Sequence, residues 1–323
     1  MIHFCTYFDR NYLTRAVSLH QSLVRHCPPF TLWALCLDDD AHAAVSALGI
    51  ESLQPVRLAD LEQADPALLE AKQDRSTVEY YFTLSPALPL YLLDSVPDME
   101  SITYLDSDLL FYSSPQPIFD ELGAGSVAIV PHRYPPSLQG LSIWGTYNVA
   151  WVTFRNDSAG RAVLERWHRQ CLAWCHDRAE DGKFADQGYL DSWPGLPGVR
   201  VIEHPGVDLA PWNFMQYRID LRPNPPTVDG QPLVFYHFQG FKSVGPGLWD
   251  PGLDSYGKMH RVLRSWLYGG YLRELRSAQR LIRSRVPASA RSSSLRHSPH
   301  GWRVLVHRIE RGHVIVSPRS RHL

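Results

Sequence analysis

Apolar runs and polar breaks alternate through the first 57 residues with the periods of strands and helices. Residues 2–8 and 30–37 are apolar runs of strand length, and apolar positions in residues 13–24 recur at helical spacing between them. A short helical stretch at 41–48 and a third strand-like run at 50–57 follow. Because strand–helix–strand units join parallel strands, the pattern predicts a parallel sheet wrapped by helices, with ligands at the carboxyl ends of the strands.

The same alternation continues to residue 257. Residues 76–94 are helical in pattern, but Pro86 and Pro89 are expected to break the helix. A proline- and glycine-containing loop at 134–145 is long enough to cover a site. Further strands are expected at 101–105, 126–130, 147–154, 199–203 and 233–238, and further helices at 158–176 and from Phe184. We therefore predict one α/β domain over residues 1–257.

The strand at 101–105 ends in two carboxylates, Asp106 and Asp108, and the chain then becomes apolar again. Side chains at i and i+2 point to the same side of a strand, and burying both acids without a partner would be costly. A hard divalent cation such as Mg²⁺ or Mn²⁺, shared with phosphates, suits this pair. A solvated turn is the ordinary alternative. A phosphatase nucleophile of the Asp-x-Asp-x-Thr type is a third, which Leu110 at the threonine position weakens.

The pattern changes after Gly257. Apolar positions from Met259 to Ile282 form one helical stripe. Six arginines border it: Arg261, Arg264, Arg273, Arg276, Arg280 and Arg283. Such a helix is typical of segments that lie flat on anionic lipid, and docking on its own domain is the alternative. We predict a basic helical tail over residues 258–323, with a flexible linker at 288–300.

Charge divides along the same boundary. Residues 1–257 carry 17 Lys/Arg against 31 Asp/Glu, whereas residues 258–323 carry 15 against two, for a total net charge of −1. The acidic body argues against nucleic acid as a partner, and the basic tail indicates an anionic membrane surface. This division supports the membrane interpretation of the tail.

The cysteines and the hydropathy of the chain indicate the cellular compartment of the protein. Five cysteines without paired spacing fit a reducing compartment. His168, Cys171 and Cys175 share a helix face and could form a soft-metal cluster, but buried free thiols are the favoured interpretation. The chain begins directly as a strand, and no run of about 18 apolar residues exists. We expect a cytoplasmic protein, peripherally associated with the inner face of the membrane.

Four separated motifs occur together, in one order, at the ends of predicted strands. They are Thr6–Tyr12, Tyr104–Asp108, Tyr147–Ala150 with Asp186-Gln187, and His237–Lys242. In this combination the chain resembles the nucleotide-sugar glycosyltransferases of the GT-A fold, specifically glycosyltransferase family 8, as a distant branch. The resemblance spans residues 2–250. It implies a GT-A, Rossmann-like, mixed but mostly parallel sheet flanked by helices.

The resemblance also implies roles for the matching residues. Asp106, Asp108 and His237 would hold Mn²⁺ or Mg²⁺ against the diphosphate of a UDP-sugar, with Gly240 and Lys242 at the phosphates. Thr6, Tyr7 and Tyr12 would form the base-binding patch, Asp9 would also bind the UDP-sugar, and Asn148, Asp186 and Gln187 would surround the donor sugar. The family's arginine before the metal motif has no match here, and Arg75 is the candidate substitute.

The implied activity is transfer of a hexose from a UDP-sugar to a hydroxyl acceptor, a glycolipid or polysaccharide precursor. The resemblance implies retention of the anomeric configuration. Front-face attack is the favoured route, because the residue expected nearest the anomeric carbon is Gln187 and not an acid. An inverting enzyme would use Asp186 as general base. A metal-dependent phosphohydrolase with Asp106 as nucleophile, and a non-catalytic carbohydrate- or membrane-binding adaptor, are the alternatives.

Overall fold

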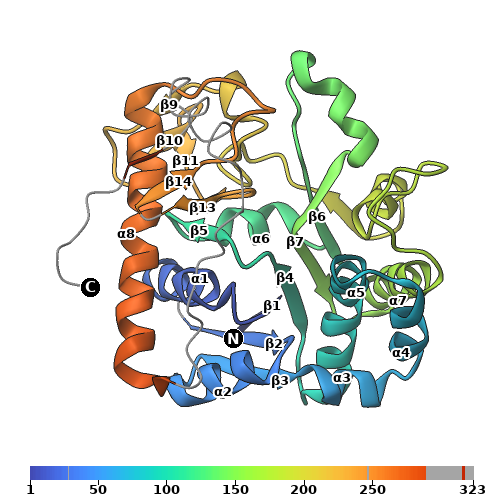
Figure 1. The fold of residues 1–323 in the computed structure, drawn as a ribbon. Helices are drawn as coiled ribbons and strands as arrows, with labels where there is room; N and C mark the ends of the chain where they lie inside the picture. The colour runs from blue at the N-terminus through green and yellow to red at the C-terminus, as the bar shows by residue number, and fades with distance from the viewer. Residues whose placement is uncertain (28, 246, 289–314, 317–323) are drawn as a thin grey trace.

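A seven-stranded sheet is the centre of the protein (Figure 1). The structure is a computed structural model that describes residues 1–27, 29–245, 247–288 and 315–316. The strand order is β3-β2-β1-β4-β7-β6-β8. The strands are β1 (Ile2–Phe8), β2 (Phe30–Cys36), β3 (Leu53–Arg57), β4 (Ser101–Leu105), β6 (Val127–Pro131), β7 (Tyr147–Arg155) and β8 (Val199–Val201).

Only β7 among these seven strands runs against its neighbours. It pairs antiparallel with β4 and β6, and every other neighbouring pair of this sheet is parallel. The mixed, mostly parallel sheet predicted from the sequence is therefore confirmed. The carboxyl ends of β1, β2 and β4 meet at one edge, which is the ligand edge expected of such a sheet.

Helices cover both faces of the sheet. Their bounds are α1 (Leu13–His26), α2 (Asp39–Leu48), α3 (Leu58–Ala64), α4 (Ala67–Ala71), α5 (Thr77–Ser95), α6 (Gln116–Leu122), α7 (Ser158–Ala173) and α8 (Arg261–Arg285). One apolar layer includes side chains of α1, α2, α6 and α8, and the other includes side chains of α3, α4, α5 and α7. The alternation of strands and helices in the sequence thus produces a three-layer arrangement.

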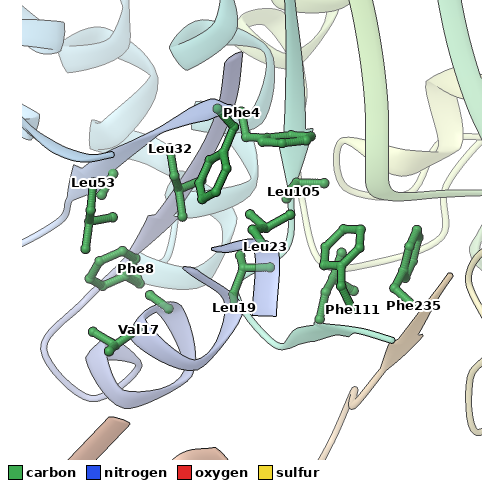
Figure 2. Close-up of a cluster of buried hydrophobic side chains, with 14 of the residues drawn as sticks. Phe4, Phe8, Val17, Leu19, Leu23, Leu32, Leu53, Leu105, Phe111 and Phe235 are labelled. Carbon is green, nitrogen blue, oxygen red and sulfur yellow. The ribbon is translucent and has the colours of Figure 1, made fainter. Parts of the chain in front are cut away.

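In the first apolar layer, buried strand side chains pack against the apolar face of α1. Phe4 of β1 and Leu32 of β2 face the α1 side chains Leu19 and Leu23, as Figure 2 shows, and all four are fully buried. Phe111 extends this layer toward the short strands beside the main sheet. Burial of each such side chain stabilises the fold by about 1.5–3 kcal/mol.

The prolines of α5 do not break it, so the sequence prediction of an interrupted helix is wrong. Pro86 and Pro89 lie inside one continuous helix, and both are buried. Each proline costs a helix about 3 kcal/mol. Ten of the nineteen α5 side chains are buried, including Leu84 and Leu88, and this burial outweighs the two lost backbone hydrogen bonds.

The strand expected at 233–238 does not join the main sheet, which corrects the sequence prediction. Its ordered part is β12 (Phe235–His237), which pairs antiparallel with β5 (Leu109–Phe111) in a separate two-stranded sheet. In this register His237 lies opposite Leu109. The pairing therefore brings His237 next to Asp108.

Short strands and 3₁₀ turns complete the described fold. Two further three-stranded sheets are β9 (Ile219–Asp220), β10 (Thr227–Val228) and β11 (Gln231–Pro232), and β13 (Lys242–Gly245), β14 (Leu248–Asp250) and β15 (Ile315–Val316). The 3₁₀ elements are η1 (Lys72–Asp74), η2 (Pro136–Trp144), η3 (Gln187–Ser192) and η4 (Phe214–Gln216). The predicted loop at 134–145 is thus largely the 3₁₀ segment η2.

Helix α8 docks on the domain along its apolar stripe. It runs beside α1 and α2 along one side of the molecule (Figure 1). Tyr271 and Leu275 are buried with residues of β5 and β12, and Ile282 is buried in the layer around α1. The expectation that this stripe lies on lipid is therefore wrong, because the domain itself offers an apolar partner. No helix of the described residues is long and apolar enough to cross a bilayer. The linker predicted at 288–300 lies outside the described residues from residue 289 onward.

Candidate metal and donor site

Two aspartates and a histidine converge where β4 ends and β5 begins. The Nε2 atom of His237 lies 3.2 Å from Oδ1 of Asp108 and 3.7 Å from Oδ2 of Asp106. One ligand atom of each residue lies within 4.8 Å of the other two. The side chains of Asp106, Asp108 and His237 are 32%, 14% and 4% exposed, so the cluster opens on the Asp106 side. Two carboxylate oxygens and an imidazole nitrogen are a donor set that fits a divalent cation.

The charges of this cluster depend on one another. Desolvation by the surrounding protein raises the pKa of Asp106 to about 6, although the charge of His237 opposes the rise. Desolvation also acts to raise the pKa of Asp108, but the charge and hydrogen bond of His237 outweigh it and lower this pKa. Burial would lower the pKa of His237, yet Asp108, Asp208 and Asp106 together raise it well above its ordinary value. The three carboxylates therefore favour a positive charge at their centre, which is what a bound cation would supply.

A fourth residue, the buried Asp208, lies on the far side of the His237 ring. Its Oδ1 is 3.6 Å from Nδ1 of His237, and its Oδ2 accepts a hydrogen bond of 3.0 Å from Nδ2 of Asn148. Nδ2 of Asn148 also lies 3.2 Å from Nδ1 of His237. Sequence reasoning expected Asn148 at the donor sugar and did not single out Asp208. The available signal was an acid between apolar residues, Val207 and Leu209.

Tyrosines connect the end of β1 to the acids. The hydroxyl of Tyr104 donates to Oδ1 of Asp106 at 3.1 Å, and the rings of Tyr7 and Tyr104 are 5.6 Å apart. The hydroxyls of Tyr7 and Ser85 lie 3.4 Å apart. Thr6 is fully buried, and its Oγ1 has no hydrogen-bond partner among the described residues. The structure thus places Tyr7, but not the Thr6 hydroxyl, in a polar chain that leads to Asp106.

The turn after β1 presents an aromatic face. The Asp9 carboxylate accepts the backbone N–H groups of Asn11 and Tyr12 and the amide of Asn11, so it shapes this turn. The Tyr12 ring is 38% exposed, and the Arg15 guanidinium lies 4.3 Å from its centroid. A supported, exposed ring of this kind suits stacking against a base. Asp9 and Tyr12 therefore lie together, with Arg15 as a support that the sequence analysis missed.

The segment after β12 runs directly beside the acids. The backbone N–H of Phe238 donates to the carbonyl of Asp108 at 3.1 Å, and Arg15 donates to the carbonyl of Phe241 at 2.7 Å. Gly240 has a φ of 74°, which a residue with a Cβ rarely adopts. Nζ of Lys242 is 4.0 Å from Asp250, and its side chain is 38% exposed. This segment, 238–242, presents a glycine turn and a partly exposed ammonium.

Asp186 and Gln187 open η3 on the α7 side of the cluster. Asp186 is 5% exposed, and its backbone carbonyl accepts a hydrogen bond from Trp167. Burial raises the pKa of Asp186 to about 7, and repulsion from Asp106 contributes to the rise. Nε2 of Gln187 donates to the carbonyl of Trp144 at 2.7 Å, so this side chain joins η3 to η2.

Arg75 is held at a different place. Its guanidinium donates to the carbonyl of Leu172 at 3.2 Å and pairs with Asp74, and its side chain is 1% exposed. These contacts link η1 to the end of α7. Within the described part of the chain, no hydrogen bond or ion pair joins Arg75 to Asp106 or Asp108.

A cavity of about 280 Å³ lies beside Gln187, separate from the residues of the acid cluster. It is lined by Ser142, Ile143, Gly145, Ala179, Glu180, Asp181, Gly182, Lys183, Gly188 and Asp191. Trp144 on η2 is 40% exposed, and its ring packs edge-on against Phe184 at 4.8 Å. The cavity is thus bordered by η2 and by the carboxylates of the 179–191 segment, and Trp144 lies in the sequence between two lining residues, Ile143 and Gly145.

His168, Cys171 and Cys175 form no metal cluster among the described residues. All five cysteines are free and buried, as the favoured interpretation expected. His168 instead pairs with Asp65 across the helix layer at 2.7 Å.

The comparisons with known proteins identify relatives and a fold. No protein-family model matches the chain. It is 35% identical to the uncharacterised protein YfnF of Bacillus subtilis over 251 residues, which cover 75% of this chain and 82% of YfnF. It is 31% identical to YfnD of the same organism over 246 residues, which cover 75% of this chain and 78% of YfnD.

Two solved structures share the architecture. The galactosyltransferase LgtC, solved with donor and acceptor sugar analogues, matches with a TM-score of 0.51 and 16% identity, over 89% of this chain and 98% of LgtC. The glycosyltransferase GlyE of Streptococcus pneumoniae matches with a TM-score of 0.50 and 14% identity, over 91% of this chain and 65% of GlyE. Both are GT-A glycosyltransferases, and the likeness shows that this chain has the GT-A fold.

Proposed function

We propose, from the premise that the chain belongs to the family of YfnF and YfnD and has the GT-A glycosyltransferase fold, that it is a metal-dependent glycosyltransferase. The proposed reaction moves a hexose from a UDP-sugar to a hydroxyl acceptor. The observation that carries the proposal is the convergence of Asp106, Asp108 and His237 at the carboxyl end of β4. This edge of the sheet is where α/β folds bind their ligands.

Asp106, Asp108 and His237 would hold Mn²⁺ or Mg²⁺, and the imidazole favours Mn²⁺ over Mg²⁺. The bound cation would neutralise the charge that develops on the leaving diphosphate. The neighbouring carboxylates support this role because they already favour a positive charge between them. This part of the proposal concerns the cluster alone and does not depend on the identity of the sugar.

The neighbouring segments supply the contacts for the nucleotide. Lys242 is an ammonium able to reach phosphate oxygens, and the positive φ of Gly240 lets the backbone approach them. Tyr12 offers an exposed ring for the uracil, with Thr6, Tyr7 and Asp9 on the same strand and turn. Arg75 is not included, because its guanidinium is engaged at the end of α7.

Asp186 and Gln187 are the candidate residues at the sugar. A carboxyl group with a pKa of about 7 is partly protonated at neutral pH and can donate a hydrogen bond to a sugar hydroxyl. Gln187 is neutral and cannot act as a carboxylate nucleophile, which favours front-face attack with retention. The acceptor hydroxyl would give its proton to the leaving phosphate oxygen as the new glycosidic bond forms. Analysis of the product anomer by NMR distinguishes this route from inversion with Asp186 as base.

We place the acceptor in the cavity beside Gln187. An exposed indole and nearby carboxylates are suited to a saccharide, because the ring covers apolar C–H faces and carboxylates accept hydroxyl hydrogen bonds. A glycolipid or polysaccharide precursor at an anionic membrane surface is the proposed acceptor class. The exposed arginines of α8 support this location.

Calorimetry with UDP in the presence of Mn²⁺ tests the proposal on the wild type and on Asp108→Ala. The wild type is expected to bind and the variant to lose most of its affinity, because one of three protein ligands is removed. Equal binding by both proteins, or by neither, would reject the metal site. Hydrolysis of p-nitrophenyl phosphate without a sugar donor would instead support the phosphohydrolase.

A further inference from the structure

We infer that Asp208 is a positioning residue, which holds the His237 ring in the tautomer whose Nε2 is free to ligate the cation. This inference rests on the proposed metal site and adds a residue that acts on it from behind the ring. It also changes the expected task of Asn148 from contact with the sugar to support of the histidine.

The two nitrogens of the His237 ring face different partners. Nε2 faces Asp108 at 3.2 Å and Asp106 at 3.7 Å, which is the side on which the candidate ligands meet. Nδ1 faces Asp208 at 3.6 Å and the Asn148 amide at 3.2 Å. A cation held with the two acids must therefore bind Nε2, and Nδ1 must then carry the hydrogen.

The two partners of Nδ1 favour different tautomers of the His237 ring. An amide NH₂ group donates, so a hydrogen bond from Asn148 to Nδ1 requires a bare Nδ1 and a protonated Nε2, which cannot ligate. A carboxylate only accepts, so Asp208 requires a protonated Nδ1 and leaves Nε2 with its lone pair. Asp208 thus selects the ligating tautomer. The Asn148 amide can then give its hydrogen bond to Oδ2 of Asp208.

The surroundings of Asp208 fit a group that is held in place for this purpose. Its side chain is 1% exposed, and Oδ1 has no hydrogen-bond partner among the described residues. Its φ is 58°, and Nδ2 of Asn213 donates to its carbonyl at 2.8 Å. The carbonyl of the next residue, Leu209, accepts the backbone N–H of His237 at 2.8 Å. The backbone that carries Asp208 is therefore joined directly to the backbone that carries His237, and a buried acid without this role would be costly.

Substitution Asp208→Asn tests the inference in the full-length protein. The test adds no nucleotide and does not depend on a measurement of activity. Titration with Mn²⁺, followed by the electron paramagnetic resonance of the free ion, measures the affinity. The variant is expected to bind about 10- to 100-fold more weakly than the wild type. Asp157→Asn, which alters the N-cap of α7, is the matched control and is expected to keep the wild-type affinity. Equal affinity of Asp208→Asn and wild type would overturn the inference.

A second measurement uses the wild type alone, so it holds even when Asp208→Asn fails to fold. In ¹⁵N-edited NMR spectra with Mg²⁺, His237 is expected to show a protonated Nδ1 and an Nε2 without hydrogen. A hydrogen on Nε2 in the Mg²⁺-bound protein would contradict the inference. A wild type that binds neither ion would remove the proposed metal site itself, and the inference with it. Failure of the site and failure of the positioning role are therefore distinguishable.

Discussion

At the residue scale, the chemistry of this protein depends on short side chains that cannot adjust their position far. Asp106 and Asp108 lie two residues apart in the sequence, in the short turn between β4 and β5, and this local geometry brings them to one side. His237 reaches them only because β12 pairs with β5. Asn148 and Asp208 arrive from two further segments and contact the same ring. The cluster therefore combines one local motif with three long-range contacts.

Trp144 carries a prediction at this scale, because it is exposed and lies between Ile143 and Gly145, which line the proposed acceptor cavity. Trp144→Ala is expected to raise the KM for the acceptor about tenfold, as loss of one aromatic contact of about 1.4 kcal/mol would. UDP affinity is expected to stay unchanged, because the indole lies on the η2 side of Gln187. Steady-state kinetics with varied acceptor and calorimetry with UDP measure the two effects.

Trp144→Phe is the control for that experiment, since it keeps an aromatic face and should retain most of the acceptor affinity. A parallel loss of UDP binding in Trp144→Ala would show that η2 supports the donor site instead. An unchanged KM would remove the cavity from the acceptor proposal.

At the element scale, the start of α5 shows how caps hold separate helices together. Ser76 and Glu79 form a capping box, in which each side chain accepts the other residue's backbone N–H. Glu79 also accepts the backbone N–H of Asp177 at 3.0 Å and lies 3.2 Å from His176, so it joins α5 to the chain beyond α7. The hydrogen bond from Ser76 is the main cause that lowers the pKa of Glu79 from 4.5 to about 2.

This shift gives a pH prediction with a definite sign. A carboxylate whose pKa is lower in the folded state stabilises the protein above its unfolded pKa, and the contribution is lost as the pH falls toward the folded pKa. Glu79→Gln is therefore expected to cost about 1 kcal/mol at neutral pH, and the difference from wild type should shrink as the pH falls from 4.5 toward 2. Urea denaturation at several pH values measures the difference.

Glu165→Gln is the matched control, because the exposed Glu165 pairs with Arg161 at 3.6 Å on one helix face. Such surface pairs contribute little, so its effect should be small at every pH. A Glu79→Gln effect that stayed constant with pH would contradict the capping interpretation.

At the scale of the whole molecule, positive and negative charges remain unevenly divided along the chain, even though α8 docks on the domain. The acidic body and the basic last segment remain distinct, although the apolar stripe of α8 is buried in the domain. Arg273 and Arg280 are exposed on the opposite side of that helix. Membrane association, which remains a prediction, therefore depends on charge and not on insertion of α8.

Reversal of these two charges tests that prediction. The double variant Arg273→Glu with Arg280→Glu is expected to reduce sedimentation with phosphatidylglycerol vesicles, since each basic residue near the surface contributes about 1 kcal/mol. Added salt should weaken the wild-type binding in the same direction. The exposed Arg166 and Arg169 of α7, reversed in the same way, are the control and should have no effect. Unchanged sedimentation of the α8 variant would refute a membrane role for this face.

The sequence alone determined what depends on local pattern. Apolar runs of strand length and helical repeats predicted the strands of the first 57 residues and their parallel arrangement. The spacing of Asp106 and Asp108 predicted their common side. These features follow from backbone geometry, which acts over a few residues.

The tertiary structure decided whatever depends on partners far apart in the chain. In the folded protein α5 is continuous through Pro86 and Pro89, β12 pairs with β5 and not with the main sheet, and the apolar stripe of α8 is buried. The tertiary structure also brought Asp208 to the His237 ring, a contact between residues that no motif connects. The physical reason is that burial and pairing energies belong to the assembled core, and a sequence pattern shows that a face is apolar without showing what will cover it.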